Sequence, residues 1–472
     1  MARPMVRDIR FDFRGGLNTT FAEDLLDARE LRRAENVRLT TYGALTTRPG
    51  SRRIHDTALE GGAPILGLAQ WDSPGGKQVV AVAGGKLHHK LEAATDFATV
   101  ASPALSTTKP TIILPYRSGA SIVLYLASEG LFKWDGTTLA AVADAPAGVE
   151  FIELYKQRGF VHAGTKTLYF SKVQNLDTWS IPDGGFEDVE TFDTEPLEAL
   201  AGIGSSLLLC KADTIARFTG VDKTLIRIDT QTEGVAPNLG VVGRRAVTRL
   251  DDLLLVITDR GPYLANEAAV QEIGQKVEAT FDAIPGADRP NILAAFHRAA
   301  REAWIIGPGG PLVWAQRPQA WTGPWPLPFT VRSVAPYERP DGIDTLLAGG
   351  TDGFVRELDT GTRDDRLRAG TGGVAIPTRI TLPPLLFGVP DEVKTLRQVD
   401  VQAEIPAGGT LTVGWSSELG SGEETLAGKG PGVRSYRARF GARGRRLTLT
   451  LREENGVPIT VTGILASAYL RQ

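Results

Sequence analysis

The side chains that most often carry metal or acid–base chemistry are few and scattered in this sequence. There are five histidines among 472 residues. His88 and His89 are adjacent in a strand-like run, so their side chains point to opposite faces and cannot share one metal ion by simple geometry. His55, His162 and His297 lie far apart, and none has a second ligand at a useful spacing. A role in strands or at the surface is therefore favoured over a metal site.

Two acidic clusters raise the question of glycoside hydrolysis. The clusters are Asp359, Asp364 and Asp365, and Glu187, Asp188 and Glu190. A glycosidase needs two carboxyl groups held roughly 5 to 10 Å apart across a sugar, and neighbouring positions in a loop do not establish that distance. A solvated turn is the favoured interpretation of each cluster, and a hydrolytic pair is the alternative.

The strongest basic features are the pairs Arg52-Arg53 and Arg244-Arg245 and the run from Arg437 to Arg446. A sialidase-type site would need several arginines that converge on a carboxylate, with an activated tyrosine, and nothing in the sequence marks such a set. The alternating arginines of the run 437–446 precede an apolar stretch, which predicts a hairpin with a polar outer face. A solvated face or protein interface is favoured there over a nucleic-acid site.

Motifs of nucleophilic, metal or phosphate chemistry are also missing. The sequence contains no Gly-x-Ser-x-Gly, His-Glu-x-x-His or phosphate-loop motif. The single cysteine, Cys210, ends the apolar run 206–210, so a buried and unreactive thiol is favoured over a nucleophile. We therefore expect no catalytic, cofactor-binding or metal-ligating residues, and a protein that is not an enzyme.

Composition indicates an all-β protein that folds in a reducing compartment. Fifty-three glycines and 29 prolines stand singly or in pairs between apolar runs, as turns do in all-β folds. One cysteine excludes an internal disulfide framework. A net charge of −3 provides no basic field for gripping nucleic acid. The N-terminus has no signal-like apolar segment, and no stretch reaches the roughly 18 apolar residues of a membrane span, so we expect no membrane insertion.

A repeated pattern runs through residues 61–370. Each instance has an aliphatic run, a turn with glycine or aspartate, and a second apolar or aromatic run. The seven turns lie near residues 85, 130, 165, 212, 261, 310 and 353. Their mean spacing of about 45 residues is close to the length of a four-stranded propeller blade. This spacing predicts a β-propeller of about seven blades, with six and eight as alternatives.

The two flanking segments differ from the repeat. In residues 1–60, Asp27 and Glu30 resemble a capping box and predict a short helix through Arg33. Strands flanking a turn at Tyr42-Gly43 are expected to follow, which gives a strand–helix–strand segment. In residues 371–472, strand-like runs recur every 12 to 18 residues or so, which predicts a separate β-sandwich-like domain.

Several short motifs resemble a family of phage proteins. They are the runs Phe-Arg-Gly-Gly-Leu-Asn at 13–18, Asn-Val-Arg-Leu at 36–39, Tyr-Gly-Ala-Leu at 42–45 and Thr-Arg-Pro-Gly at 47–50. Further matches occur at 171–179, 212–220, 349–362 and, more weakly, 394–401. Together these stretches resemble the tail nozzle, or packaged-DNA stabilisation (tail hub), proteins of short-tailed bacteriophages. That family has no catalytic residues to transfer.

The resemblance implies a structural protein of the virion tail that is assembled in the host bacterial cytoplasm. Such proteins form a homo-hexameric ring that closes the head–tail channel, retains packaged DNA and provides its exit path. The implied partners are the adaptor and the tail fibre or needle proteins, and DNA passes without specific binding. The alternatives are a glycan- or receptor-binding propeller of a phage tail and a glycoside hydrolase.

Overall fold

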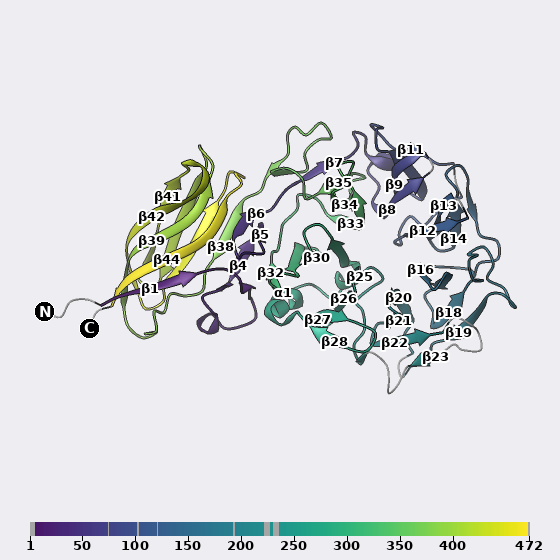
Figure 1. The fold of residues 1–472 in the computed structure, drawn as a ribbon, viewed down its shortest axis with the longest axis horizontal. Helices are drawn as coiled ribbons and strands as arrows, with labels where there is room; N and C mark the ends of the chain where they lie inside the picture. The colour runs from purple at the N-terminus through teal and green to yellow at the C-terminus, as the bar shows by residue number, and fades with distance from the viewer. Residues whose placement is uncertain are drawn as a thin grey trace.

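The computed structural model describes residues 5–73, 75–101, 103–119, 121–191, 194–220, 227–229 and 236–470. The fold is all-β and consists of many small, mostly antiparallel sheets. Seven sheets of four or five strands lie around a centre at one end of the molecule, and a module of two larger sheets lies at the other end (Figure 1).

The seven small sheets follow one another along the chain, and we number them sheet 1 to sheet 7. Sheet 1 comprises β8 Ile65–Ser73, β9 Gly76–Ala83, β10 Lys86–Leu91 and β11 Ala98–Thr99. Sheet 2 comprises β12 Ile112–Ser118, β13 Ser121–Ala127, β14 Leu131–Trp134 and β15 Leu139–Ala141. Sheet 3 comprises β16 Phe151–Tyr155, β17 Arg158–His162, β18 Thr167–Phe170 and β19 Gly185–Asp188.

Sheets 4 to 7 continue the same antiparallel order. Sheet 4 comprises β20 Leu197–Ile203, β21 Ser206–Lys211, β22 Thr214–Thr219, β23 Arg227–Asp229 and β24 Ala236–Pro237. Sheet 5 comprises β25 Val247–Leu250, β26 Leu253–Thr258, β27 Gly261–Ala265 and β28 Val270–Glu272, and sheet 6 comprises β29 Leu293–His297, β30 Glu302–Gly307, β31 Gly310–Ala315 and β32 Ala320–Thr322. Sheet 7 comprises β33 Val331–Glu338, β34 Asp344–Gly350, β35 Val355–Leu358 and β7 Ser51–Arg53.

The first strands of these sheets make contacts in a circular order. β8 contacts β12, the contacts continue through β16, β20, β25 and β29 to β33, and β33 contacts β8. Apolar side chains fill the spaces between neighbouring sheets; one cluster joins Ile65 and Ala81 of sheet 1 to Leu347 and Val355 of sheet 7. The arrangement is propeller-like, because each sheet packs its faces on the two adjacent sheets.

The predicted repeat is confirmed as a pattern of hairpins. Each of the seven expected turns lies at or next to the connection between the second and third strands of one sheet. The fourth strands are shorter and more variable, and several are barely apolar, which is why the sequence indicated them only weakly.

Sheet 7 contains strands from two distant parts of the chain. Its fourth strand is β7, which pairs antiparallel with β35 so that Arg52 lies opposite Glu357. The last sheet is therefore completed by a segment that precedes the first sheet in sequence. This pairing protects the edge of β35.

The two-sheet module also uses strands from both ends of the chain. Its large sheet has the order β42-β39-β44-β6-β5, with β1 paired to β44, and its small sheet has the order β4-β38-β43-β40-β41. The strands are β1 Met5–Phe11, β4 Arg33–Glu35, β5 Val37–Leu39, β6 Leu45–Thr47, β38 Thr378–Thr381, β39 Lys394–Ile405, β40 Thr410–Ser417, β41 Gly420–Ala427, β42 Gly430–Gly444, β43 Thr448–Glu453 and β44 Thr460–Leu470. Buried side chains of both sheets form one core, so the module is sandwich-like.

The N-terminal 60 residues are thus divided among several sheets. β1, β5 and β6 join the large sheet, β4 joins the small sheet, and β7 joins sheet 7. The polar strand β41 was not expected from the sequence, because it is an edge strand that is largely exposed on both faces.

The helix expected from Asp27 to Arg33 is wrong. Glu30 does accept a hydrogen bond from the Asp27 N–H (3.1 Å), as in a capping box, but this bond closes a turn. The chain then continues as β3 Glu30–Leu31, which pairs in parallel with β2 Gly16–Leu17. Glu30 is buried beside Asn18 and Lys276, and these tertiary contacts hold the chain in an extended conformation.

Helices are short throughout. The only α-helix among the described residues is α1 Glu278–Asp282, and the 3-10 helices there are Glu23–Leu25, Leu59–Gly61, Gln275–Val277 and Arg289–Asn291. The remaining small sheet pairs β36 Arg363–Asp364 with β37 Val374–Ala375. In the described part of the chain, no helix is long and apolar enough to span a membrane.

Candidate functional site

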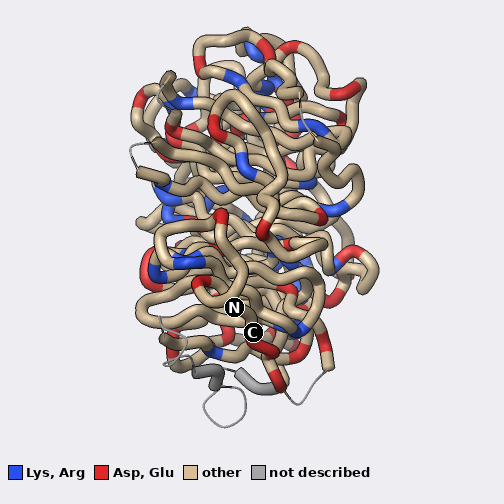
Figure 2. The backbone as a smooth tube through the Cα atoms, turned by 90° about the vertical axis from the view of Figure 1, so that its right-hand side faces the viewer, with Lys and Arg blue, Asp and Glu red and all other residues tan. Residues whose placement is uncertain are grey.

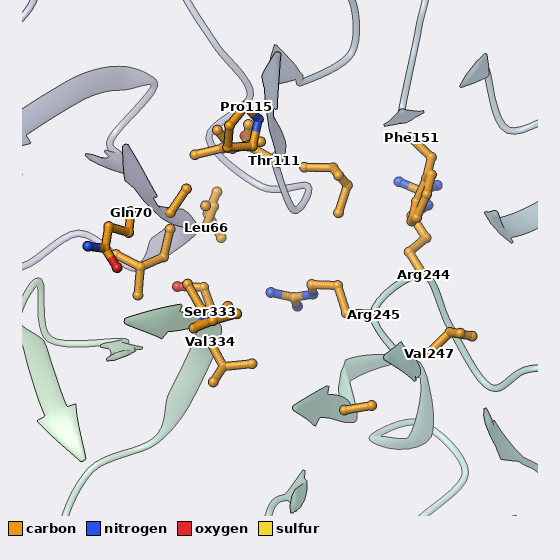
Figure 3. Close-up of a pocket in the computed structure, with 18 of the residues that line it drawn as sticks. Leu66, Gln70, Thr111, Pro115, Phe151, Arg244, Arg245, Val247, Ser333 and Val334 are labelled. Atoms are coloured by element: carbon orange, nitrogen blue, oxygen red, sulfur yellow. The ribbon is translucent and has the colours of Figure 1, made fainter. Parts of the chain in front are cut away.

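A cavity of about 500 Å³ lies at the centre of the seven small sheets. Its walls come from β8, β12, β16, β25, β29 and β33 and from the turn before β25. Most of the lining is apolar, with Leu68, Ile113, Pro115, Val334 and Pro336 among its residues. We call this the central cavity (Figure 3). Its size is within the range of small-molecule sites.

Two adjacent arginines, Arg244 and Arg245, enter the central cavity from the turn before β25. The Ala246 N–H donates to the carbonyl of Gly243 in this turn (3.1 Å), and the Ala294 N–H donates to the carbonyl of Arg245 (2.8 Å). These backbone bonds fix the turn to β29. The two side chains diverge in Figure 3, with that of Arg244 toward Phe151 and that of Arg245 across the cavity.

Arg244 is compensated by acidic groups. Its guanidinium donates to the Glu150 carboxylate, which also accepts from Lys109 (2.6 Å), and Glu198 lies 4.0 Å away. Burial raises the pKa of Glu198, an effect that Arg244 partly opposes. Arg244 therefore lines the cavity while it takes part in a local ion-pair network.

Arg245 has no such compensation. Its Nη1 donates to the carbonyl of Arg332, and no carboxylate forms an ion pair with it among the residues the structure describes. Burial, with the neighbouring Arg332 and Arg244, lowers the pKa of Arg245 to about 10. The group remains cationic at neutral pH, so the cavity contains an uncompensated guanidinium.

One further titratable group belongs to an innermost strand. Glu153 of β16 has its pKa raised to about 7 by burial, and the Gly202 backbone and Arg249 oppose the shift. A raised carboxyl pKa is one feature of a general acid. The groups that act on Glu153 include no second carboxyl group of the kind a glycosidase pair needs.

The acidic cluster at 359–365 is not a solvated turn, so that expectation is wrong. Asp364 is 2% exposed and accepts from Arg48 at 2.5 and 3.0 Å. Asp365 accepts from Arg53 (2.7 and 2.8 Å), and Asp359 pairs with Arg38 (2.7 Å). We call these six residues the clamp. The local sequence gave no sign of them as pairs, because each arginine lies more than 300 positions from its aspartate.

The clamp has a second layer of contacts that orients its arginines. Arg38 also forms two hydrogen bonds with Glu302 (2.7 and 2.9 Å), and Arg48 Nε donates to Asn36 Oδ1 (2.7 Å). The Asp359 carboxylate accepts from His297 (2.8 Å). The hydrogen bond from His297 and the charge of Arg38 together hold the pKa of Asp359 down to about 2, against the opposing effect of its burial. The clamp joins the N-terminal strands to sheets 6 and 7.

The second acidic cluster is exposed, as expected. Glu187 and Asp188 lie on β19, the outermost strand of sheet 3, and Glu190 follows it. Glu190 forms an ion pair with Lys166 (2.5 Å), and Asp188 accepts from Thr167 (2.7 Å). Acidic and basic residues are interspersed at this end of the molecule (Figure 2).

The cysteine is buried in the fold, as are His88 and His162. Cys210 is fully buried, and burial raises the pKa of its thiol to about 12, which agrees with the expected unreactive side chain. His88 and His162 are buried, and burial lowers the pKa of each, for His162 to about 3. Within the described ranges, no three His, Cys, Asp or Glu side chains are grouped for a metal ion.

The basic run at 437–446 forms one long strand and not a hairpin. β42 pairs with β39 in the large sheet, whereas β43 belongs to the small sheet, so the predicted hairpin is wrong. The polar outer face is confirmed, because Arg437, Arg439 and Arg443 are exposed. The turn at 445–446 carries the chain from one sheet to the other, a change that alternation along the sequence does not reveal.

The outer face of the large sheet is basic and hollow. Cross-strand neighbours place Arg439, Gln398, Ser467 and Asp8 in one row across four strands. Arg10, Arg397, Arg439 and Arg443 are exposed, and none forms an ion pair among the described residues. Arg397 stacks on Tyr469 with 4.8 Å between guanidinium and ring centre. We call this surface, with its shallow hollow between Val6, Arg397 and Arg439, the basic face.

Comparison with known proteins gives no family for this chain. No family model matches the sequence, and no curated protein matches it. A solved structure of the mitotic checkpoint complex is similar over 69% of this chain and 93% of the other, with 11% identity and a TM-score of 0.44. The computationally designed Ika8 protein is similar over 65% and 99%, with 14% identity and a TM-score of 0.36. These low scores carry no functional argument.

Proposed function

We propose that this protein is a structural component of a bacteriophage tail, in which it forms the nozzle or hub ring. In this proposal sheets 1 to 7 are the blades of a seven-bladed β-propeller, closed by β7. Six copies surround an axial channel below the adaptor, retain packaged DNA and provide its exit path. The ring is assembled in the bacterial cytoplasm and becomes part of the virion, where it meets fibre or needle proteins.

The clamp is the observation that carries the proposal. The motifs that resemble the nozzle family contain Asn36, Arg38 and Arg48, and these side chains are held in ion pairs and hydrogen bonds between the N-terminal strands and sheets 6 and 7. These motif residues hold parts of the fold together, which supports a scaffold role for the protein. Such a joint suits a protein that must keep two modules in fixed register under load.

The basic face supports an assembly role. Arginine and tyrosine are enriched at protein interfaces, and both contribute to this hollow surface. Four exposed arginines without ion-pair partners in the described part of the chain are available to a neighbouring molecule. We propose that the basic face contacts the adjacent copy of this chain, in the heterologous manner of a cyclic ring.

Electron microscopy of the purified chain and of intact tails tests the proposal. We expect rings of six copies around an open axial channel, and a native mass that corresponds to six chains. A monomer at every concentration, together with tails that lack this chain, would overturn the proposal.

A glycan- or receptor-binding propeller is the second candidate, and the central cavity favours it. An apolar cavity with a few convergent polar groups is the usual form of a binding site. Glycan-array binding by an isolated monomer, with no rings in the microscope, would favour this alternative. A glycoside hydrolase is a third candidate, and release of reducing ends from host polysaccharide would identify it.

A further inference from the structure

We propose that the central cavity binds a small organic monocarboxylate, whose carboxylate pairs with Arg245 and whose apolar body lies against β8, β12 and β33. The ligand class is set by the cavity's chemistry and does not depend on the proposed tail function. Three features of the cavity favour such a ligand: the free charge of Arg245, the ion-paired charges around Arg244, and the apolar wall opposite.

The guanidinium of Arg245 is positioned to receive an anion. It extends across the cavity toward the wall that carries Ser333 and Leu66 (Figure 3). A guanidinium has five N–H donors, and the structure assigns Arg245 a single side-chain hydrogen bond, to the carbonyl of Arg332. The remaining donors can form the two parallel hydrogen bonds by which arginine recognises a carboxylate.

The wall near Arg245 also has an unused polar atom. Ser333 lines the cavity and is 3% exposed, and its Oγ has no hydrogen-bond partner among the described residues. A buried hydroxyl without a partner is uncommon in a folded protein. The Ser333 Oγ itself has almost no accessible surface and lies against Gly349 of β34, so it is part of the wall and does not face the ligand.

The surrounding charges favour a monovalent anion. Arg244 is already paired with Glu150, which also forms an ion pair with Lys109, and Glu198 lies 4.0 Å from Arg244. One guanidinium is therefore free in a cavity whose lining also includes Asp72, with Glu150 and Glu198 beside Arg244. A phosphate dianion would bring a second negative charge toward Glu150 and Glu198, which like-charge repulsion disfavours.

The rest of the cavity favours an apolar body on the ligand. Leu68, Ile113, Pro115 and Val334 offer aliphatic surface within reach of the same space. Each methylene group that the ligand buries should raise its affinity about fourfold. A chain of several carbons should therefore bind much more tightly than acetate, although both have the same charged group.

Isothermal titration calorimetry of the full-length chain at pH 7 tests whether the central cavity binds a monocarboxylate. The probes are sodium hexanoate, sodium acetate, inorganic phosphate and the neutral analogue hexanol. We expect hexanoate to bind with one site per chain, and the other three probes to bind at least about tenfold more weakly. No detectable hexanoate binding, or equal binding of hexanol, would overturn the proposal without any variant.

Substitution of Arg245 gives the second arm. Arg245→Gln should weaken hexanoate binding at least about tenfold, because hydrogen bonds to a charged group are lost. Arg245→Lys, which keeps the charge but not the paired donors, should give an intermediate affinity. Arg260→Gln removes an exposed arginine from the β26–β27 turn and should leave binding unchanged. Unchanged affinity in a folded Arg245→Gln variant would contradict the assignment.

Discussion

Arg48 shows how one residue can hold two modules together. It is 3% exposed, and its guanidinium contacts Asp364, the Asn36 side chain and the carbonyl of Pro326 (2.9 Å). These partners belong to three different parts of the fold. A buried charge in such a position is tolerated only because each of its donors finds an acceptor.

Loss of Arg48 should therefore be costly. We expect Arg48→Met to lower the free energy of unfolding by about 3–5 kcal/mol, because it leaves the Asp364 carboxylate buried without its partner. Urea unfolding followed by tryptophan fluorescence measures the change. The double variant Arg48→Met, Asp364→Leu should recover much of the loss. A cost below about 1 kcal/mol for the single variant would show that the pair does not stabilise the fold.

His55 should make stability depend on pH. It is fully buried, its Nδ1 bonds the carbonyl of Thr57 and its Nε2 accepts from the Val355 N–H, each at 2.7 Å. Burial lowers the pKa of His55 from 6.5 to about 4. Between these pH values only the unfolded chain binds the proton, so stability falls as pH falls, by roughly 3 kcal/mol over the window.

The variant His55→Gln isolates this contribution. It should be less stable than the parent at pH 7, and its stability should vary less between pH 6.5 and pH 4. Urea midpoints at several pH values give both curves, and their difference removes the titration of carboxyl groups common to the two proteins. Parallel curves would contradict the prediction.

At the scale of elements, β7 is the strand that joins the two ends of the repeat. It pairs with β35, and the Arg53 N–H donates to the carbonyl of Arg366 (2.8 Å) on its other side. Gly50 immediately precedes β7, and a Cβ placed there would lie 1.9 Å from the carbonyl oxygen of Arg363. Only glycine allows so close an approach of two backbones.

Gly50→Ala should displace β7 from β35. We expect a loss of at least about 2 kcal/mol in the free energy of unfolding, with faster hydrogen exchange at the amides of β7 and β35. Gly441→Ala is the matched control, because nothing lies within 4 Å of a Cβ at that position of β42. Equal exchange in the two variants would mean that the approach of Gly50 to Arg363 does not hold the strand.

At the scale of the whole molecule, the basic face should decide whether copies assemble. The double variant Arg397→Glu, Arg439→Glu reverses two exposed charges on it, and we expect the six-copy ring to be lost while the monomer stays folded. Like charge placed against a complementary surface costs several kcal/mol. Native mass spectrometry and circular dichroism measure the two properties.

A second double variant with the same change in charge, but away from the basic face, shows whether assembly depends on that face or on net charge alone. Arg260→Glu, Arg317→Glu alters two exposed arginines on sheets 5 and 6 that form no ion pair in the described part of the chain. These variants should still assemble. If both double variants assemble equally well, the basic face is not the contact between copies.

The sequence by itself determined the repeat. Hairpins with apolar strands on either side of a glycine or aspartate turn are local features, and all seven were found where the spacing predicts them. Burial of Cys210 followed in the same way from its apolar run. Local patterns suffice here, because strand propensity and turn chemistry act over a few neighbouring residues.

Only the tertiary structure decided how distant segments combine. Glu30 has the spacing of a helix cap, yet burial beside Lys276 places it in a strand. Asp364 follows a turn-like stretch, yet Arg48 makes it a buried ion pair. Arg245 looks like any surface arginine until the ring of sheets places it in a cavity. Each outcome depends on contacts between residues far apart in the sequence, whose energy exceeds the small preferences that a local sequence expresses.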